Sequence, residues 1–125
     1  MTEADVISHW RKGARDALDA AHLLQENKKF ALALFNTHLA VEKALKARYM
    51  EELRKESPPT HNLVLLAGQL KHAWSDSEKR QLDYLTQYSV AARYDDPFWA
   101  EREATAENTA KCIAAAEQFL SVLLP

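Results

Sequence analysis

The sequence has few of the residues that interrupt helices or cross-link chains. Of its 125 residues, two are glycine, four are proline and one is cysteine. Because breakers are so sparse, long uninterrupted stretches remain, which favours helices over a sheet with many turns. The single cysteine, Cys112, cannot form an intrachain disulfide, which favours a reducing cytoplasm. We interpret Cys112 as a small packing residue.

Two further absences concern membranes and charge. No segment approaches the roughly 18 apolar residues that a membrane span needs, and the first residues lack the basic and apolar stretches of a signal peptide. We therefore expect a cytoplasmic protein with no membrane partner. The formal charge of −2 gives no global attraction to nucleic acid. Charge is uneven, however, because residues 28–55 carry seven basic side chains against three acidic ones.

Apolar residues recur at helical spacing along most of the chain. The pattern predicts one domain over residues 1–125, an all-α bundle of about five helices, four long and one short. The expected helices span about 5–26, 29–55, 61–72, 76–88 and 97–123. Asp5 and Glu78 complete capping boxes, and Pro97 is well suited to a first helical position. The expected N-caps are Thr2, Thr60, Ser75 and Asp96.

The helix expected at 29–55 has an apolar face covering about half its surface and a separate narrow stripe of small residues. Such a helix is usually central to a bundle, and the small residues would let another helix approach closely. The stripe consists of Ala33, Ala40, Ala44 and Ala47. The large aromatic residues are interpreted as core or helix-end packing and not as a base-stacking platform. They are Trp10, Trp74, Trp99, Phe30 and Phe98.

Glu42 breaks the apolar face of this helix, with His38 and Lys46 four residues to either side. A buried carboxylate is costly unless it is paired, and Lys46 is placed to pair with it. Two interpretations stay open: a structural ion pair that fixes helix register, or the polar floor of a cleft or dimer seam. The carboxylate and histidine spacings of a di-metal bundle are missing, so we predict no metal site and no cofactor.

Arg54 and His61 form the pattern Arg-x6-His. A cation that holds phosphate and an imidazole that moves a proton are the groups needed to cleave RNA through its own 2′-hydroxyl. The alternative is that His61 caps or packs at a helix start. The connector at 93–97 contains Arg93 and Tyr94, which either bind a ligand or pin the connector to the bundle.

Three blocks of the sequence resemble the HEPN domain family. They are residues 35–46 (FNTHLAVEKALK), 60–63 (THNL) and 88–97 (YSVAARYDDP). Their order and spacing match, and the resemblance extends from about residue 5 to 122. It implies an up-and-down helical bundle that usually forms a homodimer and often pairs with a separately encoded minimal nucleotidyltransferase, in the manner of a toxin–antitoxin system.

Many members of this family are metal-independent RNA endonucleases, and the resemblance implies that Arg54 and His61 form the catalytic pair. Lys55 and Leu63 differ from the family's nuclease pattern, so a non-catalytic module for dimerisation and partner docking remains the alternative. The alanine stripe and the charge asymmetry would serve that docking. The residues expected to bind nucleotide or RNA are Lys43, Lys46, Arg48, Arg93 and Tyr94.

Overall fold

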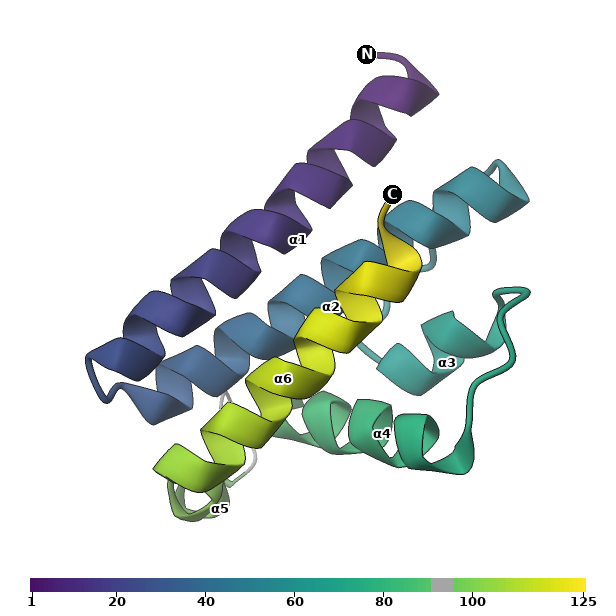
Figure 1. Ribbon diagram of the computed structural model, residues 1–125. Coiled ribbons are helices and arrows are strands. Elements are labelled where there is room, and N and C mark those ends of the chain that lie inside the picture. Colours follow the sequence, from purple (N-terminus) through teal and green to yellow (C-terminus); the bar gives the residue numbers. More distant parts are fainter. Residues whose placement is uncertain (91–95) are drawn as a thin grey trace.

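The computed structural model is helical, as the sequence predicts (Figure 1). It describes residues 1–90 and 96–125, without the side chains of Val90 and Pro97. Those residues contain no strand. None of the helices in those residues is long and apolar enough to cross a membrane. The helices are α1 (Glu3–Glu26), α2 (Phe30–Leu53), α3 (Leu63–Gly68), α4 (Asp76–Val90), α5 (Pro97–Glu103) and α6 (Ala106–Leu123).

Both predicted capping boxes are present. The Thr2 hydroxyl accepts the N–H of Asp5 at 3.1 Å, and the Asp5 carboxylate accepts the N–H of Thr2 at 3.0 Å. Ser75 and Glu78 repeat this exchange at 3.1 and 2.8 Å. Each box satisfies two backbone donors that the first turn of a helix would leave without partners.

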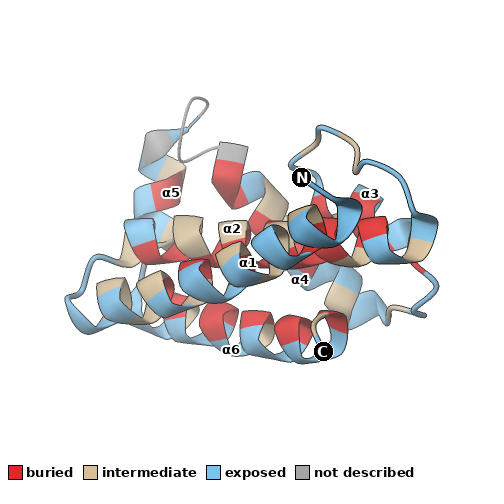
Figure 2. Cartoon of the chain, turned by 90° about the horizontal axis from the view of Figure 1, so that it is seen from above, coloured by how far each residue is buried: buried red, intermediate tan, exposed pale blue. Residues whose placement is uncertain are grey.

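The helix α2 lies at the centre of the bundle and contacts each of the other five helices. It runs antiparallel to α1, as the short turn at 27–29 requires (Figure 1). Its buried surface extends around most of its circumference (Figure 2). All four alanines of the predicted stripe, at 33, 40, 44 and 47, are 0% exposed within the single chain. The stripe therefore serves packing inside the monomer, and its expected use in dimerisation is wrong.

The third helix is shorter than predicted. It begins at Leu63 and ends at Gly68, and its N-cap is Asn62, whose side chain accepts the N–H of Leu65 at 3.1 Å. Thr60 is not the cap, because its hydroxyl accepts the N–H of Asn62 and forms a turn before the helix. His61 consequently lies in this turn and not in the helix.

The last predicted helix is two helices, α5 and α6. Asp96 caps α5 as expected, accepting the N–H of Trp99 at 2.9 Å. A second cap then interrupts the chain, because the Thr105 hydroxyl accepts the N–H of Asn108 at 3.1 Å. The Asn108 amide in turn donates to the carbonyl oxygen of Glu103 at 2.8 Å, which satisfies the end of α5.

Aromatic side chains join α4 to the two C-terminal helices. The buried Tyr88 hydroxyl donates to the carbonyl oxygen of Ala100 at 3.2 Å, and the Trp99 ring packs against both Tyr84 and Tyr88. Packing is therefore confirmed for Trp99, whereas Phe98 is 74% exposed and its expected packing role is wrong. Cys112 is buried, as predicted for a packing residue.

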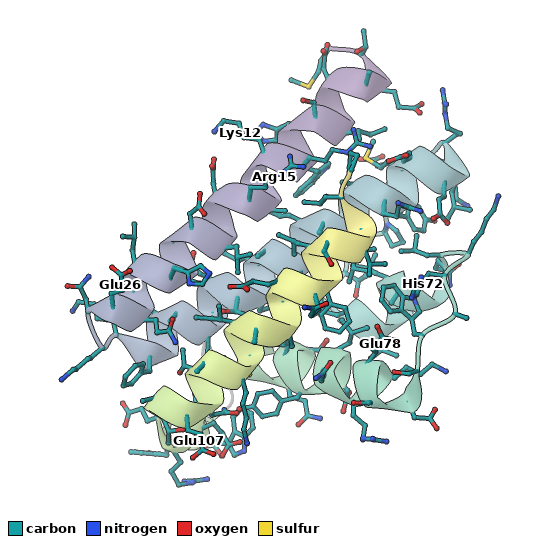
Figure 3. The ribbon with its side chains drawn as sticks, in the orientation of Figure 1. Lys12, Arg15, Glu26, His72, Glu78 and Glu107 are labelled. Carbon is teal, nitrogen blue, oxygen red and sulfur yellow. The ribbon has the colours of Figure 1, made fainter. Side chains whose placement is uncertain are left out.

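The C-terminal residue of the chain lies beside α1. Arg15 of α1 points toward the last residues of the chain (Figure 3), and its guanidinium donates to the carbonyl oxygen of Pro125 at 3.1 Å. The helices α1 and α6 also contact each other, and both pack on α2.

Candidate functional site

The carboxylate of Glu42 has a basic partner on each oxygen. Lys46 Nζ lies 3.1 Å from Oε2, and His61 Nδ1 lies 2.8 Å from Oε1. Glu42 is only 5% exposed. The four residues His38, Glu42, Lys46 and His61 are called the Glu42 cluster below. The ion pair that the sequence predicted between Glu42 and Lys46 is confirmed.

His38, one turn before Glu42 on α2, ties the cluster to the loop that follows α2. Its Nε2 lies 3.2 Å from the carbonyl oxygen of His61 and 3.6 Å from Glu42 Oε1. A carbonyl oxygen can only accept, so Nε2 of His38 carries a proton and donates it. His38 is 1% exposed and therefore fixes the backbone of His61 from within the core.

His61 combines a fixed ring with access to solvent. Its side chain is 59% exposed, although Nδ1 is held by the buried Glu42. Because the carboxylate accepts the Nδ1 proton, the lone pair of the neutral ring is on Nε2. A carboxylate that orients an imidazole in this way is the arrangement found behind general-base histidines. The geometry can therefore place a proton acceptor at the surface.

Glu42 is ionised at neutral pH despite its burial. Burial by itself raises the pKa of this carboxyl group. Hydrogen bonds from His61 and Lys46, together with the charges of His38 and Lys46, lower the pKa by more than burial raises it. The net result is a pKa below the ordinary value.

Lys46 is an internal component of the bundle. It is 8% exposed, and its Nζ lies 5.5 Å from the centre of the Trp10 ring of α1. An ammonium group over an indole face gains a cation–π attraction, which adds to the ion pair with Glu42. To bind phosphate, as predicted, the Lys46 ammonium group would have to leave both Glu42 and Trp10.

The other basic residues predicted on α2 have different neighbours. Lys43 lies against Gly13 of α1. Arg48 Nε lies 2.7 Å from Glu52 Oε2, and the other oxygen of Glu52 accepts the backbone N–H of Lys71 at 2.9 Å. Lys43, Lys46 and Arg48 thus contact three separate parts of the bundle.

Arg54 follows α2 directly and adopts a left-handed backbone conformation with φ of 55°. Its Nε lies 2.8 Å from Glu3 Oε1, and its side chain is 76% exposed. Arg54 and His61 therefore have different carboxylate partners, Glu3 and Glu42. An exposed ion pair of this kind is weak, so Arg54 can exchange Glu3 for a phosphate at little cost.

The connector residues Arg93 and Tyr94 lie outside the described residues, so their predicted roles stay predictions. Among the residues that are described, no group of three or more histidine, cysteine or acidic side chains is arranged to hold a metal ion. The link between Glu42 and His61 was not predicted. They are nineteen positions apart, and the loop between α2 and His61 has no periodic pattern from which their contact could be inferred.

Comparison with known proteins agrees with this architecture. The HEPN domain pattern matches residues 7–124. The crystal structure of TT1696 from Thermus thermophilus aligns with a TM-score of 0.81 and 22% identity over 94% of each chain. That of ST0689, an archaeal HEPN homologue, aligns at 0.75 and 20% identity over 94% of this chain and 93% of that one. No curated protein matches significantly. The chain belongs to the HEPN domain family.

Proposed function

We propose that this HEPN-domain protein binds RNA and cleaves it without a metal ion, with His61 as the group that moves the proton. The observation that carries the proposal is the bond between His61 Nδ1 and the buried Glu42 carboxylate, 2.8 Å long, on a ring that is 59% exposed. It fixes the ring and leaves Nε2 as the basic atom.

In the proposed reaction, His61 Nε2 accepts the proton of a ribose 2′-hydroxyl. The 2′-oxygen then bonds to the adjacent phosphorus while the bond from phosphorus to the 5′-oxygen breaks. The products are a 2′,3′-cyclic phosphate and a 5′-hydroxyl, whose proton comes from water. The hydroxide that remains takes the proton from His61 Nε2, which restores the neutral ring. Arg54, which is exposed and pairs with Glu3, supplies positive charge to the phosphorane.

The test is cleavage of a short single-stranded RNA in the presence of EDTA. Acid–base catalysis by a positioned side chain contributes about a hundredfold or more, so His61→Gln is expected to lower the rate by at least that factor. The matched control is His22→Gln, since His22 Nε2 also lies 2.8 Å from a glutamate, Glu117, on an exposed face. Equal rates for His61→Gln and the parent protein would eliminate the assigned site.

Glu42 is a positioning residue in this scheme, so its variants need a readout beyond the rate. Glu42→Gln keeps an acceptor for the His61 Nδ1 proton, whereas Glu42→Leu removes it. We expect Glu42→Leu to lower kcat with little change in KM for RNA, and Glu42→Gln to restore most of the kcat, because the orientation of the ring depends on that acceptor. A purely structural role would give the two variants the same loss of kcat.

The second candidate is a non-catalytic module that docks onto a separately encoded nucleotidyltransferase in the cytoplasm. The pairing of cations on α2 favours this function, because Lys46 is buried against Glu42 and Arg48 pairs with Glu52. Co-purification with such an enzyme and no RNA turnover would support this function. Titration with ATP, followed by tryptophan fluorescence, would reveal nucleotide binding without cleavage.

A homodimer is also proposed, in line with the resemblance to the family. The mass measured by light scattering at micromolar concentration is expected to be twice that of the 14.2 kDa chain. A monomeric mass across that range would reject the dimer and leave the test of His61 unaffected.

A further inference from the structure

A second region of the molecule, apart from the Glu42 cluster, has the features of a ligand site. The helices α4 and α6 border a cavity of about 290 Å³. Its floor is apolar, with Leu85 and Cys112 both buried and Ala115 beside them. This volume is close to the lower end of the range for small-molecule sites in proteins, so the cavity suits a small ligand.

One wall of the cavity is held in place by hydrogen bonds. The Asn108 amide donates to the Tyr84 oxygen at 2.6 Å and to the carbonyl oxygen of Glu103 at 2.8 Å. The backbone N–H of Asn108 is bound by Thr105. A tyrosine hydroxyl is protonated at neutral pH and is able to donate, and burial raises the pKa of Tyr84 further above its ordinary value.

Among the described residues, the charged ones that line the cavity are both cations, Arg80 from α4 and Lys111 from α6. The other polar lining residues, such as Ser77 and Gln81, are neutral. Lys111 lies 3.5 Å from Glu107 at the start of α6 (Figure 3), but both side chains are more than 70% exposed, so this pair is weak. A cavity bordered by two cations is notable in a chain of net charge −2.

We propose that the cavity between α4 and α6 binds a small organic anion, a flat apolar body that carries one carboxylate or sulfonate group. The body lies on Leu85 and Cys112, and the anionic group lies between Arg80 and Lys111. An apolar floor combined with a few convergent polar groups is the general design of small-molecule sites. The site shares no residue with the Glu42 cluster, so it stands or fails independently of the proposed nuclease.

The probe is 1-anilinonaphthalene-8-sulfonate, which has a flat apolar body and one sulfonate. Its fluorescence is expected to rise saturably with one equivalent bound per chain. Arg80→Gln and Lys111→Gln should each weaken binding about fivefold, the effect of removing one partly exposed charge contact. The control is Lys71→Gln, because Lys71 is exposed and does not line the cavity. Equal affinity in all three variants would overturn the proposal.

Two further readouts separate this site from binding to partly unfolded protein. A ligand of the native cavity raises the Tm, whereas a probe that prefers unfolded chains lowers it. Cys112 is the only cysteine and lines the floor, so the probe should slow its alkylation by iodoacetamide, as measured by mass spectrometry. A lowered Tm, or alkylation at the same rate with saturating probe, would contradict binding in this cavity.

Discussion

Lys46 Nζ and Glu42 Oε2 lie 3.1 Å apart on α2, in an ion pair whose side chains are only 10% and 6% exposed. Removing the cation leaves a buried negative charge with fewer partners. We expect Lys46→Met to lower the free energy of unfolding by about 3–5 kcal/mol, the usual effect of breaking a buried pair. Chemical denaturation followed by circular dichroism measures this change.

The control for that experiment is the exposed pair of Lys12 and Asp16, whose atoms lie 2.7 Å apart on α1. Figure 3 shows Lys12 extending away from the bundle. Lys12→Met should change the free energy of unfolding by less than about 1 kcal/mol. Similar losses of unfolding free energy in the two variants would mean that burial does not determine how much the Glu42–Lys46 pair contributes to stability.

The stability of the fold should depend on pH through Glu42. The pKa of its carboxyl group is below the ordinary value of 4.5 in the folded protein, so the unfolded chain binds its proton more readily. The stabilising contribution is present above about pH 4.5 and is lost as pH falls through the folded-state pKa. Glu42→Gln should therefore be less stable than the parent at pH 7, and the difference should shrink in acid. A constant difference from about pH 7 to about pH 3 would contradict this assignment.

Gly13 lies inside α1, where alanine is intrinsically favoured by about 1 kcal/mol. The atoms nearest to a Cβ atom there would belong to the Lys43 side chain, with its Cδ at 3.1 Å. Because that side chain is flexible, we expect Gly13→Ala to raise the free energy of unfolding by about 0.5 kcal/mol. Gly68→Ala is the comparison, since among the described residues no atom outside the adjoining backbone and neighbours lies within 4 Å of its Cβ position. Stabilisation by Gly68→Ala alone would show that Lys43 is held rigidly.

The break between α5 and α6 can be tested at Thr105. Loss of an N-cap side chain costs about 1 kcal/mol, so Thr105→Ala should destabilise the protein by that amount. In a continuous helix the same substitution would be stabilising, because alanine is the better helix former. Ser121→Ala, on the exposed face inside α6, supplies the reference for a position within a helix.

Periodicity and capping chemistry were sufficient to predict the architecture. The boxes at Thr2 and Ser75 involve residues only three positions apart, so local sequence determines them. The division at Thr105 was missed because apolar spacing continues across it. The Asn108 side chain bonds to the carbonyl oxygen of Glu103 at the end of α5, five positions earlier in the chain. Local propensity does not reveal such a side-chain bond in advance.

The candidate site was predicted in separate parts. Helical spacing placed Lys46 beside Glu42, because residues four apart share a helix face. His61 reaches the same carboxylate through a loop that contains two prolines, and no pattern in the sequence specifies the path of that loop. Burial of Lys46 likewise depends on Trp10 of the preceding helix, which is a tertiary contact.

The left-handed backbone at Arg54 has a consequence for protein engineering. Glycine adopts this conformation without the steric penalty of about 1 kcal/mol that a side chain incurs. Arg54→Gly should therefore give a more heat-resistant protein while removing the cation offered to phosphate. This one substitution would then raise thermal resistance and lower RNA turnover. A selection for thermal resistance should enrich Arg54→Gly, and a selection for RNA turnover should remove it.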